Sequence, residues 1–129
     1  MSNKPITALF AGTFDPYTIG HHRIVLRALA MSDKIVVAIG RNIEKRTMFS
    51  VDERMEAIKK LYINEPRVEV TTYEGLTTDY AQSIGATHLL RGVRSVKDFE
   101  YERDLADLNL RIGGVDTLLL MGAASACTT

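Results

Sequence analysis

The sequence from residue 8 to residue 22 reads Ala8-Leu9-Phe10-Ala11-Gly12-Thr13-Phe14-Asp15-Pro16-Tyr17-Thr18-Ile19-Gly20-His21-His22. Residues 6–11 are a short, mostly apolar run, which predicts a buried strand. Gly12 allows the backbone to bend sharply and Pro16 ends strand pairing, so a turn is expected there. Over residues 20–31 the apolar side chains recur at the helical period, which predicts a helix. Its inward face is expected to consist of Ile24, Val25, Ala28 and Leu29.

A turn of this kind brings the start of the helix beside the carboxyl end of the strand. Backbone N–H groups are unpaired at a helix start, and the helix dipole is positive there, so anions bind well at this position. His21 lies in the first turn of the expected helix, close to where a phosphate would bind. A lone histidine here is more often a structural residue, but the preceding turn favours a phosphate pocket. His22 is expected to be a surface residue.

The rest of the chain alternates between strand and helix patterns. Further strands are expected at residues 34–39, 67–72, 87–90 and 116–121. Further helices are expected at residues 50–62, at 77–84 and from residue 95 to the glycines at 113–114. Right-handed crossovers place such helices on both faces of a parallel sheet. The pattern therefore predicts an α/β fold with a doubly wound, five-stranded parallel sheet that is Rossmann-like.

Local signals support three of these helices. Ser50 followed by Glu53 is a capping-box pattern at the start of the second helix. Gly85 suits the C-terminal end of the third helix, and Ser95 suits the start of the fourth. The inward faces of the second and fourth helices are expected to include Met55, Ile58, Leu61, Phe99, Leu105 and Leu108.

Ligands in parallel sheets of this type bind beyond the carboxyl ends of the strands. This rule selects the turn after the first strand, the loop at residues 40–49, the turn at 74–77 and the segment at 91–94. These segments are far apart in the sequence. We expect them to converge in space and to form the functional site.

Several polar residues in these segments suit phosphate chemistry. Thr13 offers a hydroxyl group in the first turn, and Asp15 is expected to brace that turn as an Asx-type residue. Lys45 lies in a charged loop, a pattern that is equally typical of a solvated surface. Arg91 and Arg94 lie between a buried strand and a capped helix, where guanidinium groups and helix N–H groups together suit a phosphate.

The composition is that of an ordinary soluble globular protein of 129 residues, with 46% hydrophobic and 25% charged residues. The formal net charge is zero, which disfavours general binding to nucleic acid. No apolar run approaches the roughly 20 residues that span a bilayer, and no signal-peptide pattern follows the N-terminus. Cys127 is the single cysteine, so an internal disulfide is excluded, and this fits a cytoplasmic location.

Three segments carry a resemblance to a known family. Thr18-Ile19-Gly20-His21 resembles the His-x-Gly-His motif of the nucleotidyltransferase superfamily, with threonine in the first position. Residues 45–50 resemble the Lys-Lys-Pro-Met-Phe segment of phosphopantetheine adenylyltransferases, with Arg46 and Thr47 in place of lysine and proline. Residues 91–102 resemble the same family closely, and related cytidylyltransferases and pyridine-nucleotide adenylyltransferases do not share them. The resemblance covers residues 6–121.

The resemblance implies a Rossmann-like nucleotidyltransferase fold and a homo-oligomer, usually a hexamer. It implies transfer of the adenylyl group of ATP to 4′-phosphopantetheine, which gives dephospho-coenzyme A and pyrophosphate during coenzyme A biosynthesis. Mg²⁺ would accompany the ATP, and coenzyme A is a further expected ligand. Nucleic acids and membranes are not expected partners, and no protein metal site is implied.

The resemblance also implies roles for individual residues. The catalytic residues would be His21, Lys45 and Thr13. The residues that bind phosphopantetheine would be Thr13, Lys45, Thr77 and Arg91. The residues that bind ATP would be Thr13, Phe14, His21, Gly92, Val93, Arg94 and Glu102.

The nucleophile of this reaction is a phosphate group that is already anionic, so no general base is required. In-line attack on the α-phosphate, without a covalent enzyme intermediate, depends mainly on positioning and electrostatic stabilisation. His21 and Lys45 would donate hydrogen bonds to the α-phosphate. Thr13 would support the attacking phosphate, and Arg91 would neutralise the acceptor.

The resemblance stops after Met121. The family continues with an Ile-Ser-Ser-Ser type segment that begins a phosphate-binding helix, whereas residues 122–129 are small and show no periodicity. We therefore interpret residues 1–121 as the nucleotidyltransferase domain and residues 122–129 as an irregular tail, a truncated or altered C-terminus. One alternative is a related enzyme, such as a nicotinate mononucleotide adenylyltransferase or a glycerol-3-phosphate cytidylyltransferase. The other is a nucleotide-binding subunit with impaired catalysis.

Overall fold

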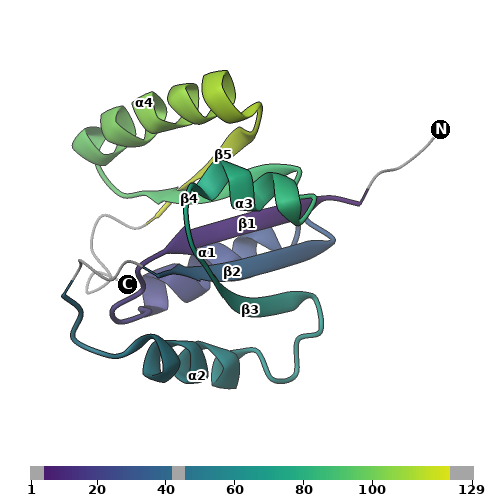
Figure 1. Cartoon of the computed structure of the whole chain (residues 1–129), viewed down its shortest axis with the longest axis vertical. Coiled ribbons are helices and arrows are strands. Elements are labelled where there is room, and N and C mark those ends of the chain that lie inside the picture. Colours follow the sequence, from purple (N-terminus) through teal and green to yellow (C-terminus); the bar gives the residue numbers. More distant parts are fainter. Residues whose placement is uncertain (1–4, 42–45, 123–129) are drawn as a thin grey trace.

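The structure is a computed structural model that describes residues 5–41 and 46–122 of the chain (Figure 1). These residues form a five-stranded sheet in the order β3-β2-β1-β4-β5, in which all neighbouring strands are parallel. The elements in chain order are β1 (Thr7–Gly12), α1 (Ile19–Ala28), β2 (Lys34–Gly40), α2 (Val51–Leu61), β3 (Val68–Tyr73), α3 (Thr77–Ser83), β4 (His88–Val93), α4 (Val96–Gly113) and β5 (Asp116–Met121). The predicted α/β fold with a five-stranded parallel sheet is confirmed.

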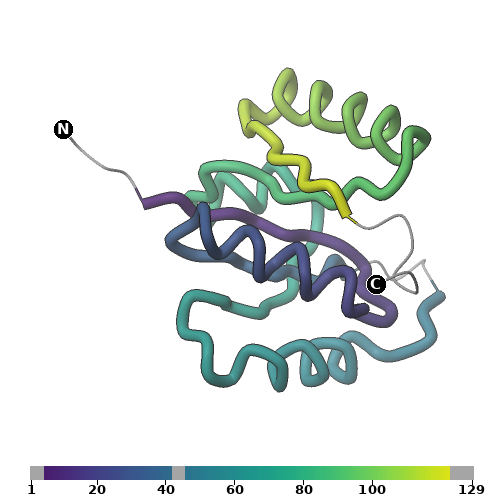
Figure 2. Tube along the Cα trace, turned by 180° about the vertical axis from the view of Figure 1, so that it is seen from behind, coloured from purple at the N-terminus to yellow at the C-terminus, as the bar shows by residue number. Residues whose placement is uncertain are grey.

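Helices cover both faces of the sheet, as a doubly wound fold requires (Figures 1 and 2). One core lies between the sheet and helices α1 and α2, and Phe10 contributes to it. The second core lies under α3 and includes Leu9 and Ala81. Leu9 and Phe10 are neighbours on β1 that face opposite cores, so both are buried. This double burial explains why the central strands have continuous apolar sequences.

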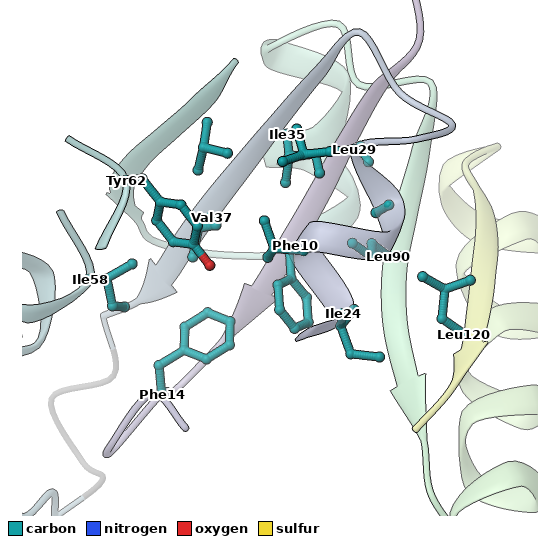
Figure 3. Close-up of a cluster of buried hydrophobic side chains, with 14 of the residues drawn as sticks. Phe10, Phe14, Ile24, Leu29, Ile35, Val37, Ile58, Tyr62, Leu90 and Leu120 are labelled. Carbon is teal, nitrogen blue, oxygen red and sulfur yellow. The ribbon is translucent and has the colours of Figure 1, made fainter. Parts of the chain in front are cut away.

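The larger core fixes α1 and α2 against the same face of the sheet (Figure 3). Ile24 from α1, Ile58 from α2 and Leu90 from β4 all belong to this cluster, and the last two are fully buried. The rings of Phe10 and Phe14 meet edge to face, with their centroids 5.2 Å apart. Their packing places the start of α1 beside the carboxyl end of β1.

The helix caps follow the sequence signals. Ser50 and Glu53 form the predicted capping box at the start of α2, with both reciprocal hydrogen bonds present. The Ser95 side chain accepts a hydrogen bond from the backbone N–H of Asp98 and so begins α4. Gly85 follows α3 with a φ of 71°, a conformation that favours glycine.

The predicted strands agree with the observed ones to within one residue, except for β4. The predicted strand ended at residue 90, whereas β4 continues to Val93 and pairs with β5 as far as Met121. The prediction was wrong because the apolar run stops at Arg91, although the backbone pairing does not stop there. Arg91 therefore projects from within the sheet rather than from a loop after it.

The predicted inward faces of α2 and α4 are only partly correct. Ile58 is buried and Met55 packs against the core, but Leu61 is 52% exposed. On α4, Phe99 and Leu108 are 42% and 50% exposed. The α4 prediction failed because this helix packs mainly against β5, β4 and α3 at the edge of the sheet, so part of its apolar surface stays exposed. Within residues 5–41 and 46–122, no helix combines the length and apolar character that a membrane crossing requires.

Candidate active site

The turn after β1 depends on a close approach between Gly12 and the ring of Phe14. A Cβ atom on Gly12 would lie 3.1 Å from two atoms of that ring, so the ring occupies the space that a side chain would fill. The residue with a positive φ is Phe14, at 51°, and not Gly12, which corrects the prediction that Gly12 supplies the bend. The Thr13 carbonyl in this turn accepts a hydrogen bond of 2.6 Å from Nη1 of Arg54 on α2.

Asp15 connects the turn to a segment that is distant in the sequence. Its carboxylate accepts hydrogen bonds from the backbone N–H groups of Met48 and Phe49, just before α2. Asp15 therefore has the structural role that was predicted. The predicted partner was wrong, because Asp15 bonds to the segment before α2 and not to its own turn. The contact anchors the end of the loop that contains Lys45, which itself lies outside the described residues.

Replacing Asp15 with alanine is expected to lower the free energy of unfolding by about 1–3 kcal/mol, because two backbone N–H groups lose a charged acceptor. Denaturant unfolding measures this change. Glu56→Ala, at an exposed position of α2, is the matched control and is expected to stay within about 0.5 kcal/mol of the wild type. Equal stability of the Asp15 variant and the wild type would contradict this role.

His21 is held in one orientation by the start of α1. Thr18 caps the helix, and its backbone N–H donates to Nδ1 of His21 over 2.8 Å. The backbone N–H of His21 donates in return to the hydroxyl oxygen of Thr18. Because a backbone N–H can only donate, Nδ1 must be the acceptor, and the neutral ring carries its proton on Nε2. His21 is thus arranged to donate a hydrogen bond from Nε2.

The surroundings of His21 favour this neutral form. Burial lowers the pKa of the imidazole below its ordinary value of 6.5, and the positive charges of Arg94 and Arg91 lower it further. The rings of Phe14 and Tyr17 pack against it at centroid distances of 5.0 and 5.2 Å. Near neutral pH, His21 is therefore an uncharged donor in a positively charged environment.

An NMR titration of the His21 ring is expected to give a midpoint below 6.5. The unfolded chain takes up this proton at a higher pH than the folded protein. The neutral ring therefore stabilises the fold at neutral pH, and this contribution is lost as the pH falls from 6.5 towards the folded pKa. Arg94→Gln is expected to raise the midpoint because it removes a repelling charge. Lys97→Gln is the control, and an equal shift in both variants would contradict the assignment to Arg94.

Arg91 and Glu102 form a partly buried, bidentate ion pair. Nε and Nη2 of Arg91 each lie 2.9 Å from a carboxylate oxygen of Glu102, which is 7% exposed. Nη1 of Arg91 donates to the carbonyl of Ala11 on β1 over 2.8 Å. The hydrogen bond to Glu102 raises the pKa of Arg91. The resemblance assigns Arg91 to phosphopantetheine and Glu102 to ATP, whereas the structure shows the two side chains paired with each other.

Two hollows meet at the carboxyl ends of the central strands. The first, of about 590 Å³, is bordered by the segments after β1, β2 and β3 and by β4. The second, of about 770 Å³, lies between the first turn, α1 and the start of α4. Thr13 and Arg91 line both hollows. The predicted convergence of four distant segments is confirmed for the described residues.

The structure brings together most of the predicted site residues. Thr13, Thr77 and Arg91 line the first hollow. The second hollow is lined by Thr13, Phe14, His21, Gly92, Arg94 and Glu102. The side chain of Val93 is fully buried, and Val93 lines neither hollow, so the structure does not place this predicted residue in the site. Among residues 5–41 and 46–122, no group of three or more His, Cys, Asp or Glu side chains could hold a metal ion.

Sequence reasoning missed several residues of this site. Arg41 lines the first hollow, and its Nε donates to the Thr72 hydroxyl oxygen over 3.1 Å. Arg23 and Arg27 line the second hollow. Arg54 is buried, and its guanidinium donates a hydrogen bond to the Thr13 carbonyl. The periodic spacing of Arg23 and Arg27 along α1, four residues apart, was a signal that could have placed both on one side of the helix.

His22 also differs from its prediction. It was expected on the surface, but it is partly buried, and its Nδ1 lies 2.9 Å from the hydroxyl oxygen of Tyr62. Tyr62 lies directly after α2, so this contact joins two helices that are about 40 residues apart in the sequence. The neighbouring His21 lines the second hollow, so the side chains of these two adjacent histidines lie in different environments.

Comparisons with known proteins agree with this geometry. The family described as cytidylyltransferase-like matches residues 9–122. A phosphopantetheine adenylyltransferase of Porphyromonas gingivalis is 56% identical over 117 residues, which cover 91% of this chain and 76% of that protein. One from Bacteroides fragilis is 48% identical over 113 residues, covering 88% of this chain and 75% of that protein.

Solved structures share the fold at low sequence identity. A bifunctional NMN adenylyltransferase/ADP ribose pyrophosphatase of Francisella tularensis has a TM-score of 0.66 at 15% identity and covers 95% of this chain and 39% of its own. A lipopolysaccharide core biosynthesis protein of Thermoplasma volcanium has a TM-score of 0.63 at 17% identity. The match covers 93% of this chain and 98% of that protein. The fold, the residues that converge at the strand ends and the identity to curated relatives lead to one conclusion: the chain belongs to the phosphopantetheine adenylyltransferase family, within the cytidylyltransferase-like proteins.

Proposed function

We propose that this enzyme transfers the adenylyl group of ATP to 4′-phosphopantetheine, giving dephospho-coenzyme A and pyrophosphate. The observation that carries this proposal is the junction of the two hollows at Thr13 and Arg91. Such a junction allows two anionic substrates to meet end to end. The relatives at 48–56% identity are named for the same activity.

The linings of the hollows indicate which substrate each would take. The first hollow combines apolar side chains, among them Leu76 and Leu105, with the hydroxyl of Thr77, and so suits a long, mostly neutral pantetheine arm. The second hollow contains His21 and Arg94 and suits a nucleotide with its phosphates. We therefore assign phosphopantetheine to the first hollow and ATP to the second.

Adenylyl transfer requires one bond to form and one to break at the α-phosphorus. An oxygen of the phosphopantetheine phosphate attacks in line, and the bond to the pyrophosphate leaving group breaks. The acceptor phosphate is already anionic, so the chain needs no general base. Its contribution is to hold the two reacting groups and to stabilise negative charge as it develops.

The residues at the junction can supply that stabilisation. We propose that Nε2 of His21 donates to an α-phosphate oxygen, as the tautomer fixed by Thr18 allows. The Thr13 hydroxyl supports the attacking phosphate, and Lys45 is proposed to contribute a second donor to the α-phosphate. Arg91 neutralises the acceptor, and its ion pair with Glu102 fixes the guanidinium before substrate arrives. Mg²⁺ would accompany ATP as part of the nucleotide complex and would supply positive charge that offsets the charge on the pyrophosphate.

We also propose that the enzyme acts in the cytoplasm as a homo-oligomer, with the hexamer implied by its family resemblance, and that coenzyme A binds as a further ligand. Exposed apolar side chains on α4 and β5 support self-association, since their burial at an interface would remove apolar surface from water. They include Val96, Phe99, Leu110 and Met121. Light scattering coupled to size-exclusion chromatography tests the assembly, and a monomer at micromolar concentration would contradict it.

Product analysis tests the reaction directly. The purified chain is incubated with ATP, Mg²⁺ and 4′-phosphopantetheine, and we expect dephospho-coenzyme A by mass spectrometry together with an equal amount of pyrophosphate. Dephosphorylated pantetheine, nicotinate mononucleotide, and glycerol-3-phosphate with CTP are expected to give no product. Chelation of Mg²⁺ by EDTA is expected to abolish turnover. Product from another acceptor, without dephospho-coenzyme A, would contradict the proposal.

A further inference from the structure

A chain of hydrogen bonds lies beside His21, and none of its members has a part in the proposed reaction. The hydroxyl oxygens of Tyr17 and Tyr62 are 2.6 Å apart. The Tyr62 oxygen also lies 2.9 Å from Nδ1 of His22. Tyr17 lies in the turn before α1, and His22 lies in the first turn of α1. Tyr62 is the residue directly after α2. The Tyr62 hydroxyl therefore joins both sides of the segment that contains His21.

Within this series of hydrogen-bonded side chains, Tyr17 is the residue that contacts His21. Their rings are stacked, with centroids 5.2 Å apart and an interplanar angle of 29°. The Phe14 ring also meets the His21 ring edge to face, with centroids 5.0 Å apart and an interplanar angle of 83°. With Nδ1 of His21 bonded to the Thr18 N–H, the direction of Nε2 depends on how the Tyr17 ring is held.

Tyr62 is suited to hold that ring. It is 6% exposed and packs in the larger core beside Ile58, with its hydroxyl directed towards the side on which Phe14 lies (Figure 3). Burial raises the pKa of the hydroxyl groups of both Tyr17 and Tyr62, so both keep their protons and can donate. The two hydroxyl protons are enough to make both hydrogen bonds of the chain.

A second contact shows that α2 supports this turn at both ends. Arg54 on α2 donates to the carbonyl of Thr13 over 2.6 Å. Tyr62, eight residues further along, bonds to Tyr17 at the other end of the same turn. The helix therefore fixes the turn that leads from the Thr13 hydroxyl to the His21 ring.

We propose that Tyr62 is a positioning residue for His21, because its hydroxyl group holds the Tyr17 ring against the imidazole and so directs Nε2 towards the second hollow. This inference rests on the proposed role of His21 in adenylyl transfer. It assigns to Tyr62 a function in catalysis that acts through two other side chains and no contact with substrate. A purely structural role, in which Tyr62 only joins α2 to α1, is the competing explanation.

Tyr62→Phe removes the hydroxyl and keeps the ring. We expect kcat to fall about tenfold, with the KM values for ATP and phosphopantetheine changed less than about twofold, because misdirection of a donor affects the transition state more than binding. Tyr17→Phe deletes the same hydrogen bond from its other partner and is expected to cause the same fall. Tyr80→Phe is the control, since the Tyr80 hydroxyl has no hydrogen-bond partner among the described residues.

The decisive comparison repeats Tyr62→Phe in a His21→Ala background. If Tyr62 acts through His21, the second substitution is expected to cause no further fall in kcat. A fall of equal size in both backgrounds, or an unchanged kcat in Tyr62→Phe, would overturn the inference. The ring NMR signals of His21 are also expected to shift in Tyr62→Phe and to stay in place in Tyr80→Phe.

The same measurements distinguish a failure of this inference from a failure of the proposals on which it rests. Wild-type kcat in His21→Ala alone would refute the role of His21 and, with it, the positioning role in catalysis. Absence of dephospho-coenzyme A from the wild-type enzyme would refute the proposed function. In that case the His21 ring signals would still decide whether Tyr62 positions the imidazole, and unchanged signals in Tyr62→Phe would overturn that too.

Discussion

His21→Ala is expected to lower kcat for dephospho-coenzyme A formation by about a hundredfold or more, the usual cost of losing one donor to a developing anionic centre. The imidazole is fixed by the Thr18 N–H at Nδ1 and packs against the rings of Phe14 and Tyr17, so its Nε2 proton needs no reorganisation when charge develops. The KM values are expected to change much less than kcat, because the hydrogen bond strengthens in the transition state. Steady-state release of pyrophosphate measures both parameters.

Two further measurements make this result interpretable. His21→Gln keeps an amide donor at the same position and is expected to recover part of the lost turnover. Thermal unfolding checks the fold, since the alanine variant also leaves the Thr18 N–H without its side-chain acceptor. Turnover at the wild-type level in His21→Ala would remove His21 from the mechanism.

Glu102→Ala is expected to lower the free energy of unfolding by roughly 3 kcal/mol, because it leaves the guanidinium of Arg91 without its carboxylate in a largely buried site. The value lies at the lower end of the usual range, since the Arg91 side chain is 33% exposed and water can screen part of its charge. The KM for phosphopantetheine is expected to rise in the same variant, because Arg91 loses two of its three hydrogen bonds. Denaturant unfolding and acceptor titration measure the two effects.

Asp104→Ala, two residues further along α4, is the matched control. Its ion pair with Arg103 joins two exposed side chains 3.5 Å apart, and removing such a pair is expected to change stability by less than about 1 kcal/mol. Glu102→Gln, which keeps one carbonyl oxygen, is expected to fall between the two. Equal stability of the Glu102→Ala and Asp104→Ala variants would show that the Arg91–Glu102 pair contributes no more to the free energy of unfolding than the exposed pair does.

The sheet could be predicted from the sequence because each central strand is buried on both faces and therefore has a continuous apolar run. The same logic located the site, since parallel strands present their carboxyl ends at one edge. It also placed the segments that contain Thr13, Thr77 and Arg91 at one site, and in the structure these residues line a shared hollow. These conclusions depend on periodicity and topology, which a single sequence contains.

The remaining features depend on neighbours that periodicity does not specify. Phe99 and Leu108 lie on the apolar side of α4. Whether such side chains are buried depends on which element packs against them, and no described element covers them fully. Asp15 and Arg54 find backbone partners more than 30 residues away. His22 looked like a surface residue because its partner, Tyr62, lies across the α1–α2 packing. Long-range polar contacts of this kind follow from the fold and could not be inferred before it.

The central claim is that the acceptor phosphate attacks the α-phosphorus of ATP directly where the two hollows meet, with no adenylyl group ever attached to the enzyme. The stereochemistry at phosphorus tests this most directly. The enzyme is given a single diastereomer of adenosine 5′-O-(1-thiotriphosphate) with phosphopantetheine, and the configuration of the thio-product is determined by ³¹P NMR. A single in-line displacement predicts inversion at the α-phosphorus. Retention would mean that a side chain first takes up the adenylyl group, and it would contradict the account.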